Sequence, residues 1–563
     1  MLPWRVTIQR LSEAFRSDPA FRNRVLGFIV VMTLLMGAFV KGVDVSVRIG
    51  DQAASTVAAG QTYVAEDGTI TTDPSLAVTD ESGAPVLSSS PAPTLGGGAP
   101  STSGASAGRT TVGGAAVAGT AVAPAPVVPS CDGLELKATD QGVTEDTIKI
   151  GFLIPNLNEL QAAGFNVGLA GDWDKILPTW VDELNHLGGI ACRKVTYVKE
   201  VFDVLQVDDM IAKCKAMTED HKVFTVLTPG GYDSIAQLCI AKDHKTPFIN
   251  PEPEPEGWYR DAAPYLWNLL MTKDRMHRNH VRWLMQSKEL IPGDPDALAN
   301  PATRVGIVYH GIPNVAPPVE DTLIPELENA GVKPVKVVSL SSDSQQALAQ
   351  INQVVLQFQQ ARVEYVLMPM NLIYKTQFLQ AAEKQSYFPK YTDSDHYFGC
   401  FDFTTATYPE KGFDKTKCIS SLEINGMRPE DGRAFVDAHP FAQYADAVYK
   451  RVNPEGYDNG GESDQKTTDT QRGLFIGMGS QVYLWKQAAD RVDPTTITRL
   501  AWGQSMGQTG AFDKIPTPHP LTFGPEKWDG PDYISTAQWH AEAGDGYEAK
   551  KFRRTGEPFK ALA

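Results

Sequence analysis

The sequence predicts an α/β protein with two lobes, each built on a parallel sheet, behind an apolar N-terminal segment and a long linker. Between Thr147 and Pro251, four short apolar runs alternate with three segments whose apolar residues recur at helical spacing. This alternation is typical of βα units that feed a parallel sheet. A second series of the same kind follows from Arg304 to His396. Ahead of both series the composition changes, and the folded part is expected to span 131–563.

The strands of both series are predicted from short runs of apolar or alternating residues. The first series has strands at Ile148–Ile154, Val195–Val201, Val223–Leu227 and Phe248–Ile249. The second series has strands at Val305–Tyr309, Val335–Leu340 and Glu364–Met368, a further strand entering Thr392–His396, and helices at Val319–Ala330, Ser344–Ala361 and Tyr374–Gln385. Two such series packed side by side leave a cleft in which a small ligand can be buried.

Several motifs occur in a fixed order along these elements. They are N-x-x-G-G-I at Asn185–Ile190, Arg193 at the opening of the second strand, VFTVLTP, PFINP and RVGIVYHG at Arg304–Gly311. In this order the chain resembles the class I periplasmic substrate-binding proteins. Within that class it is most similar to the branched-chain-amino-acid group of ABC importers, the leucine/isoleucine/valine-binding-protein-like proteins. The likeness covers Asp146–Asp545.

The resemblance implies a hinge of three chain crossings between the lobes. These crossings are expected near Leu266–Asn268, near Asn425–Met427 and between Gln508 and Phe523. Lobe I would then comprise about 146–267 and 427–510, and lobe II about 268–426 and 511–545. Helices at Val436–Arg451 and Thr470–Arg491 would return to lobe I.

The N-terminus consists of a basic segment (1–24) and an uncharged apolar run (25–40). The run is longer than many signal-peptide cores but shorter than the about 20 apolar residues of a full membrane span. Because the basic segment is long for a cleavable signal and no A-x-A pattern follows at once, we expect a retained transmembrane anchor with the N-terminus cytoplasmic and the binding domain extracytoplasmic. The alternative is a cleaved signal and a secreted protein. Residues 41–130, rich in Ala, Gly, Ser, Thr and Pro, are expected to form a disordered linker.

The chain is acidic, with 51 Lys and Arg against 67 Asp and Glu and a net charge of −16. This balance argues against a nucleic-acid surface, which needs clustered basic residues. Six cysteines in an exported chain make disulfides plausible, and the spacing leaves fifteen full pairings open. The local pair Cys400 and Cys418 is the first expected. No C-x-x-C occurs, and no metal or other cofactor is expected.

Candidate binding residues are those that follow the strands, because ligands of α/β sheets lie at the carboxyl ends of the strands. They are Asn156, Glu159, Gly230, Gly231, Tyr232, Glu252, Glu254, Tyr309, Asn371, Tyr374 and Asp395. A Gly-Gly pair lets a ligand approach backbone N–H groups, a geometry that suits anions. Tyrosine offers a flat apolar surface with a hydroxyl.

The resemblance also bears on the ligand. In the amino-acid-binding relatives, small hydroxyl residues hold the ligand carboxylate and an acid after the seventh strand holds its ammonium. Asp395 stands where that acid belongs, but Gly230–Ser234 and the Glu-Pro run at Pro251–Glu256 stand where the hydroxyl residues would be. Carboxylates repel an incoming carboxylate, so a neutral, apolar or cationic ligand is expected. The alternative for the Glu-Pro run is an exposed, stiff loop.

The function expected from this combination is that of a membrane-tethered solute-binding protein that delivers a small molecule to an ABC permease. A surface receptor without a transporter is the alternative. A hydrolase is a third interpretation, because Gly503–Gly507 matches the G-x-S-x-G elbow around Ser505. That elbow requires a strand before the serine, whereas the preceding residues have a helical pattern. His277 and His280 share a helix face, but too few further ligands accompany them to indicate a metal site.

Overall fold

The computed structural model describes residues 131–158, 171–299, 301–396, 399–401, 405, 408–422, 439–454, 457, 465–517, 519–544 and 549–562, and two short strands nearer the N-terminus. The chain divides into two compact units, Met1–Ala116 and Val117–Ala563. In the first unit, β1 (Tyr63–Val64) pairs antiparallel with β2 (Ile70–Thr71). This pair lies in the segment expected to be disordered. The sequence between its two strands contains Asp67-Gly68, a dipeptide that is common in hairpins.

The basic segment 1–24 and the apolar run 25–40 lie outside the described residues. None of the helices that the structure does describe combines the length and the hydropathy needed to cross a bilayer. The membrane anchor therefore stays a prediction from the sequence.

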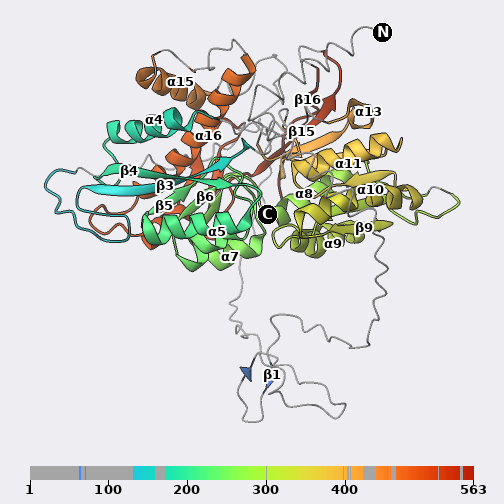
Figure 1. Cartoon of the computed structure of the whole chain (residues 1–563), viewed down its shortest axis with the longest axis horizontal. Helices are drawn as coiled ribbons and strands as arrows, with labels where there is room; N and C mark the ends of the chain where they lie inside the picture. The colour runs from blue at the N-terminus through green and yellow to red at the C-terminus, as the bar shows by residue number, and fades with distance from the viewer. Residues whose placement is uncertain are drawn as a thin grey trace, which may run out of the picture. The chain divides into compact units, whose positions relative to one another are not determined.

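The first lobe is built on a five-stranded parallel sheet with the strand order β4-β3-β5-β6-β7. Helices α4, α15 and α16 lie on one side of this sheet, and α5 and α7 lie on the other (Figure 1). The elements up to the first crossing are β3 (Thr147–Asn156), α4 (Trp173–His186), β4 (Lys194–Asp203), α5 (Val207–Lys215) with the π-helical turn η2 (Ala216–Asp220), β5 (Thr225–Leu227), α6 (Ala236–Leu238) with the π-helical turn η3 (Cys239–Asp243), β6 (Phe248–Asn250), α7 (Glu256–Ala262) and β7 (Leu266–Asn268). Those that return later are α15 (Pro440–Val452), α16 (Gln465–Ala489), α17 (Arg499–Met506), β13 (Gly510–Phe512) and β14 (Leu521–Phe523).

The second lobe has a sheet whose strand order is β16-β15-β12-β11-β10-β8-β9, with β17 also paired to β15. Its elements are α8 (Lys273–Gln286), β8 (Val305–His310), η4 (Pro318–Leu323), α9 (Ile324–Asn329), β9 (Lys336–Leu340), α10 (Ser344–Gln360), β10 (Tyr365–Leu367), α11 (Leu372–Lys384), β11 (Lys390–Ser394), α13 (Glu410–Phe413), β12 (Lys417–Ser420), β15 (Tyr533–His540), β16 (Lys551–Arg554) and β17 (Phe559–Lys560). Strands β8 to β12 are parallel, whereas β15 to β17 pair antiparallel. The expectation of a wholly parallel second sheet was therefore wrong for its C-terminal strands. Strand β16 follows β15 through a short connection, which can join antiparallel neighbours, whereas parallel neighbours need a longer crossover.

Alternating side chains of the buried strands fill a separate core on each face of each sheet. In β3, Ile150 and Phe152 pack with Trp180 of α4, while Leu153 packs with Phe202 and Phe248 on the opposite face. Strands covered by helices on both faces are continuously apolar. This is why short runs in the sequence located most of the strands.

The chain crosses between the lobes where β7 leads into α8, and a later segment pairs with this crossing. The backbone N–H of Asn268 donates to the carbonyl of Trp528 at 2.9 Å, and that of Gly530 donates to the carbonyl of Asn268 at 3.1 Å. The guanidinium of Arg275 lies 2.7 Å from Asp529, so the start of α8 is tied to the returning segment. These contacts couple two crossings into one hinge.

The third crossing lies later in the sequence than expected. Gln508–Phe523 forms the β13–β14 hairpin, whose Phe512, Leu521 and Phe523 are buried in the core of the first lobe. Because these apolar side chains stay with that core, the second lobe resumes only after Trp528 rather than at residue 511, and it extends through β17 rather than ending at 545. The crossing expected at 425–427 lies outside the described residues.

All six cysteines form disulfides in the structure. The pairs are Cys131–Cys192, Cys214–Cys239 and Cys400–Cys418. The last is the local pair that the spacing favoured. The first pair ties the segment that precedes β3 to the loop before β4.

The side chain of Arg193 joins distant parts of the first lobe. It is buried and donates to the carbonyls of Thr144 at 2.7 Å, Ala191 at 2.8 Å, Pro494 at 2.7 Å and Lys137 at 2.9 Å. We predict that Arg193→Lys lowers the free energy of unfolding by at least about 2 kcal/mol, because a single ammonium leaves buried carbonyls without donors. Urea unfolding with the exposed neighbour variant Lys194→Gln as control tests this. Equal stability of the two variants would contradict the role of the guanidinium.

Candidate functional site

The two lobes touch at the carboxyl ends of their parallel strands. Asp233, in the loop after β5, accepts a hydrogen bond from the side-chain amide of Asn314, in the loop after β8. Leu157, the residue that follows β3, packs against Leu372 and Ile373 at the start of α11. These strand ends are where α/β sheets bind ligands. We call the layer between them the interlobe site.

The loop after β5 has backbone angles that glycine adopts more readily than other residues. Gly230 has φ 130° and Gly231 has φ 81°, both in the left-handed range. The backbone N–H of Gly231 donates to Glu252 Oε1 at 2.6 Å. The anion position expected for a ligand is thus filled by a carboxyl group of the chain itself.

The Glu-Pro run is not the exposed loop of the alternative interpretation. Glu252 is 4% exposed and Glu254 is fully buried. Glu254 lies 3.1 Å from the ammonium of Lys273, the first residue of α8, and accepts a hydrogen bond from Gln237. Lys273 also lies 3.2 Å from Asp233. The single ammonium of Lys273, in the second lobe, therefore forms ion pairs with two acids of the first lobe.

The acids of this network outnumber its ammonium. Burial, together with the nearby Asp233, raises the pKa of Glu252 to about 8. Burial also raises the pKa of Glu254 well above its usual range, although Lys273 opposes the shift. Near neutral pH the network therefore retains protons that an added positive charge would displace. A ligand carboxylate would instead favour the protonated form of these acids, and it would not displace their protons.

Asp395 brings a further acid to the site from the end of β11. Its Oδ2 accepts from the backbone N–H of Ser421 at 2.6 Å and from the hydroxyl of Ser421 at 2.7 Å. Its Oδ1 is buried and has no hydrogen-bond partner among the described residues. Burial raises the pKa of Asp395 to about 6. An oxygen without a donor is suited to accept a hydrogen bond from a ligand.

Two of the other expected residues lie at the beginning of α11. The ring of Tyr374 lies 4.6 Å from that of His310, and both side chains are buried. Asn371 caps α11, with its side-chain oxygen accepting from the N–H groups of Ile373 and Tyr374. His310, at the end of β8, therefore stands beside a residue that the sequence singled out.

The printed contacts of the other expected binding residues do not link the two lobes. Tyr232 is fully buried against Phe202 and Phe248, because its large ring completes the core of the first lobe. The hydroxyl of Tyr309 donates to Glu320 of η4, on the side of the sheet that α8 and α9 cover. Asn156 is exposed and accepts from the N–H of Asn158. Glu159 lies outside the described residues.

A cluster of buried histidines under the second lobe's strand ends was not assigned a role from the sequence. His280 shares a hydrogen bond of 2.8 Å with Thr392, and the rings of His277 and His396 lie 6.2 Å apart. Next to them Lys375 and Asp393 form a buried ion pair at 2.6 Å. A cavity of about 20 Å³, lined by His277, His280 and Asp393 among others, lies at this cluster. The spacing of His277 and His280 was the sequence signal for it.

The serine of the G-x-S-x-G motif is not arranged as a nucleophile. Ser505 lies within α17, and its hydroxyl donates to the carbonyl of Ala488 at 2.7 Å. Neither a preceding strand nor a free hydroxyl is present at this position, as the elbow would require. The hydrolase interpretation has no support from this geometry.

The fold is shared with solved structures of low sequence identity. A type 1 periplasmic binding protein from Bordetella pertussis Tohama I is 17% identical, with a TM-score of 0.51 over 74% of this chain and 100% of that chain. A fatty acid ABC transporter substrate-binding protein from Thermomonospora curvata is 15% identical, with a TM-score of 0.51 over 77% of this chain and 96% of that chain.

A third structure, a solute-binding protein of an ABC transporter from Rhodopseudomonas palustris HaA2 in complex with p-hydroxybenzoic acid, is 13% identical with a TM-score of 0.51, over 74% of this chain and 98% of that one. No family model and no curated protein matches the sequence. The chain therefore has the two-lobed α/β fold of type 1 periplasmic binding proteins. At these identities the comparison shows the fold alone.

The raised pKa of Glu252 predicts a pH-dependent stability. Between the ordinary carboxyl pKa of 4.5 and the folded value of about 8, the folded chain holds a proton that the unfolded chain has lost. Stability is therefore lost as pH rises through this window. We predict that Glu252→Gln, which keeps an acceptor for Gly231, unfolds at a higher urea concentration than the unsubstituted protein at about pH 8.5 but not at about pH 5. The exposed Glu145→Gln is the control, and an equal pH slope in all three proteins would contradict the assignment.

The buried His280 predicts the opposite dependence at acid pH. Burial, with His277 and Lys375 nearby, lowers the pKa of His280 from 6.5 to about 3. Below about pH 6.5 His280 takes up a proton in the unfolded chain but not in the folded chain, so stability is lost as pH falls. We expect His280→Gln, whose amide nitrogen can still reach Thr392, to lose less stability between pH 6.5 and 4. Urea midpoints across that range measure it, and parallel curves for the two proteins would show that His280 is not responsible.

Proposed function

We propose that this protein is an extracytoplasmic solute-binding protein whose interlobe site takes a small molecule carrying a positive charge. The observation that supports it most strongly is the set of acids Asp233, Glu252 and Glu254 around the single ammonium of Lys273. Asp395 adds a carboxyl oxygen with no partner among the described residues. A cationic group at this layer would pair with groups that are otherwise protonated or unpaired.

An amino acid with a free carboxylate fits this site poorly. The N–H of Gly231, a donor suited to an anion, already donates to Glu252 at 2.6 Å. A ligand carboxylate would have to displace that acid and lie beside Asp233 and Glu254. Like charges in a buried layer repel strongly, so amines, guanidines or quaternary ammonium compounds are the preferred class.

Delivery to an ABC permease is the transport role proposed for the closed form. The shared fold with ABC transporter substrate-binding proteins from Thermomonospora curvata and Rhodopseudomonas palustris supports it. The apolar run at 25–40 and the linker at 41–130 would tether the binding domain to the outer face of the cell membrane. A surface receptor without a transporter is the second candidate. Genes for a permease and an ATPase beside this one would support import, and their absence would favour the receptor.

A thermal-shift comparison of matched compounds tests the charge of the ligand. For each carbon skeleton the panel contains the amine, the neutral amide or alcohol, and the carboxylate. Selective binding to the folded state raises the melting temperature. We predict that at least one amine stabilises the protein while its carboxylate counterpart does not. Stabilisation by carboxylates alone would contradict the proposal.

The pH dependence of amine binding tests the site. An ammonium favours ionised carboxyl groups, so affinity should rise with pH as Asp395 (pKa about 6) and then Glu252 (pKa about 8) lose their protons. We predict that Asp395→Asn, which keeps an acceptor for Ser421, weakens binding at least tenfold and flattens the profile between pH 5 and 7. Calorimetric titration measures both, with the exposed Glu145→Gln as control. An unchanged affinity and profile in Asp395→Asn would remove Asp395 from the site.

A further inference from the structure

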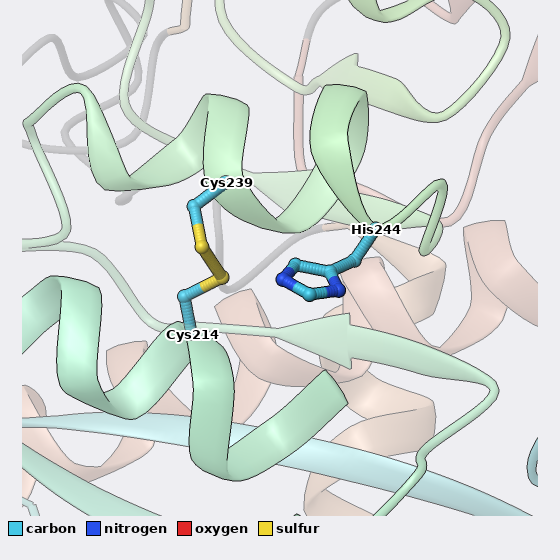
Figure 2. Close-up of side chains that lie close together, drawn as sticks. All are labelled: Cys214, Cys239 and His244. Atoms are coloured by element: carbon cyan, nitrogen blue, oxygen red, sulfur yellow. A yellow bond between two sulfur atoms is a disulfide. The ribbon is translucent and has the colours of Figure 1, made fainter. Parts of the chain in front are cut away.

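A second cluster of reactive side chains lies in the first lobe, between α5 and the helical segment α6–η3. Cys214 belongs to α5, Cys239 opens η3 and His244 follows η3 directly. One ligand atom from each lies within 4.8 Å of the others. Figure 2 shows the imidazole of His244 beside the disulfide that joins the two cysteines. Within the described part of the chain, this is the one group of three or more such donors placed so closely.

The helical segments that carry these side chains both contain a π-helical turn. In η3 the N–H of His244 donates to the carbonyl of Cys239 at 3.1 Å, and in η2 the N–H of His221 donates to the carbonyl of Ala216 at 2.8 Å. The wider turn changes which side chains share a helix face, and such turns are frequent at functional sites. As Figure 2 shows, Cys239 and His244 both point toward Cys214.

A fourth donor lies beside this group, outside the three whose ligand atoms are within 4.8 Å of one another. Glu219 of η2 places its Oε1 3.4 Å from His244 Nε2, and its side chain is 53% exposed. Each helical segment thus contributes two donors spaced five residues apart, Cys214 with Glu219 and Cys239 with His244. Two thiolates, one imidazole and one carboxylate are the ligand types that Zn²⁺ takes in a tetrahedral site.

We propose that reduction of the Cys214–Cys239 disulfide creates a zinc site made of Cys214, Cys239, His244 and Glu219. A dithiol supplies two electrons and two protons, which break the S–S bond and leave two thiols, while the dithiol becomes a disulfide. Binding of Zn²⁺ then releases the two thiol protons and forms two sulfur–zinc bonds.

Accessibility and geometry both support this exchange. Cys239 and His244 are partly exposed, so a dithiol and a metal ion can reach them, whereas Cys400 and Cys418 are buried. The Cα atoms of Cys214 and Cys239 are 6.2 Å apart, toward the long end of the disulfide range, so the two thiols of the reduced state would stay close enough to share a metal ion. In both states a cross-link joins α5 to η3, either covalent or through zinc. The inference is independent of the ligand proposed for the interlobe site.

Cobalt titration of the full chain tests the site, because Co²⁺ bound to thiolates in a tetrahedral site has a charge-transfer band and visible d–d bands. The protein is reduced with a phosphine, freed of reductant under anaerobic conditions and titrated with Co²⁺. We expect about one equivalent to give both bands and Zn²⁺ to remove them. We also expect Zn²⁺ to raise the melting temperature of the reduced protein, and oxidised protein to give neither band.

Variants distinguish this site from the other cysteines. His244→Gln should weaken Co²⁺ binding at least tenfold and Glu219→Gln several-fold, and both keep the disulfide, so their folding is checked in the oxidised state. Cys400→Ser with Cys418→Ser is the matched control and should leave the bands unchanged. Absence of a thiolate band in the reduced protein, or equal affinity in His244→Gln, would overturn the proposal. Loss of the bands in the control double variant would also overturn it, because the metal would then lie at the other pair.

Discussion

The buried ammonium of Lys273 is the contact on which the arrangement of the two lobes depends. It is the first residue of the second lobe's opening helix, yet its charge is balanced by Glu254 and Asp233 of the first lobe, at 3.1 and 3.2 Å. A buried charge needs partners of opposite sign, since leaving it unpaired costs several kcal/mol, on the order of 3–5. The chain therefore holds α8 against the strand ends of the other sheet. The same requirement favours the burial of Glu254, which would otherwise be unfavourable in the interior.

The hinge and the interlobe site are parts of one network. Asn268 pairs with the returning backbone at Trp528 and Gly530, and Arg275 ties α8 to Asp529. Only a few residues further along α8 and the adjoining strands lie the histidine cluster and Asp395. Rotation of the lobes about these crossings would change the Asp233–Asn314 contact while leaving the pairings of the hinge intact. Under the proposed function, Lys273 and Asp233 would couple the charge of the ligand to the position of the lobes.

Much of the fold could be predicted from the sequence. Strands buried on both faces appear in it as short apolar runs, and the helices that cover them appear as apolar residues at helical spacing. The placement of Asp395 at a strand end followed from the same order of elements. Other features depend on packing that no local pattern records. Tyr232 turns into the core because Phe202 and Phe248 leave room for its ring, and the β13–β14 hairpin stays with the first lobe because its aromatic residues complete that core. The burial of Glu252 depends on the backbone N–H of Gly231, and the burial of Glu254 depends on the ammonium of Lys273. In both cases the partner is distant in the sequence.

Closure of the two lobes on a cationic ligand is tested most directly by a distance measurement between them. All native cysteines are paired, so Leu205→Cys and Leu356→Cys, exposed by 40% and 47% on different lobes, can carry spin labels in the full chain. Closure of this kind predicts a distance distribution that is broad without ligand, narrows when a binding amine is added and stays broad with the matching carboxylate. A distribution that is the same with every compound, or that narrows only with carboxylates, would contradict it.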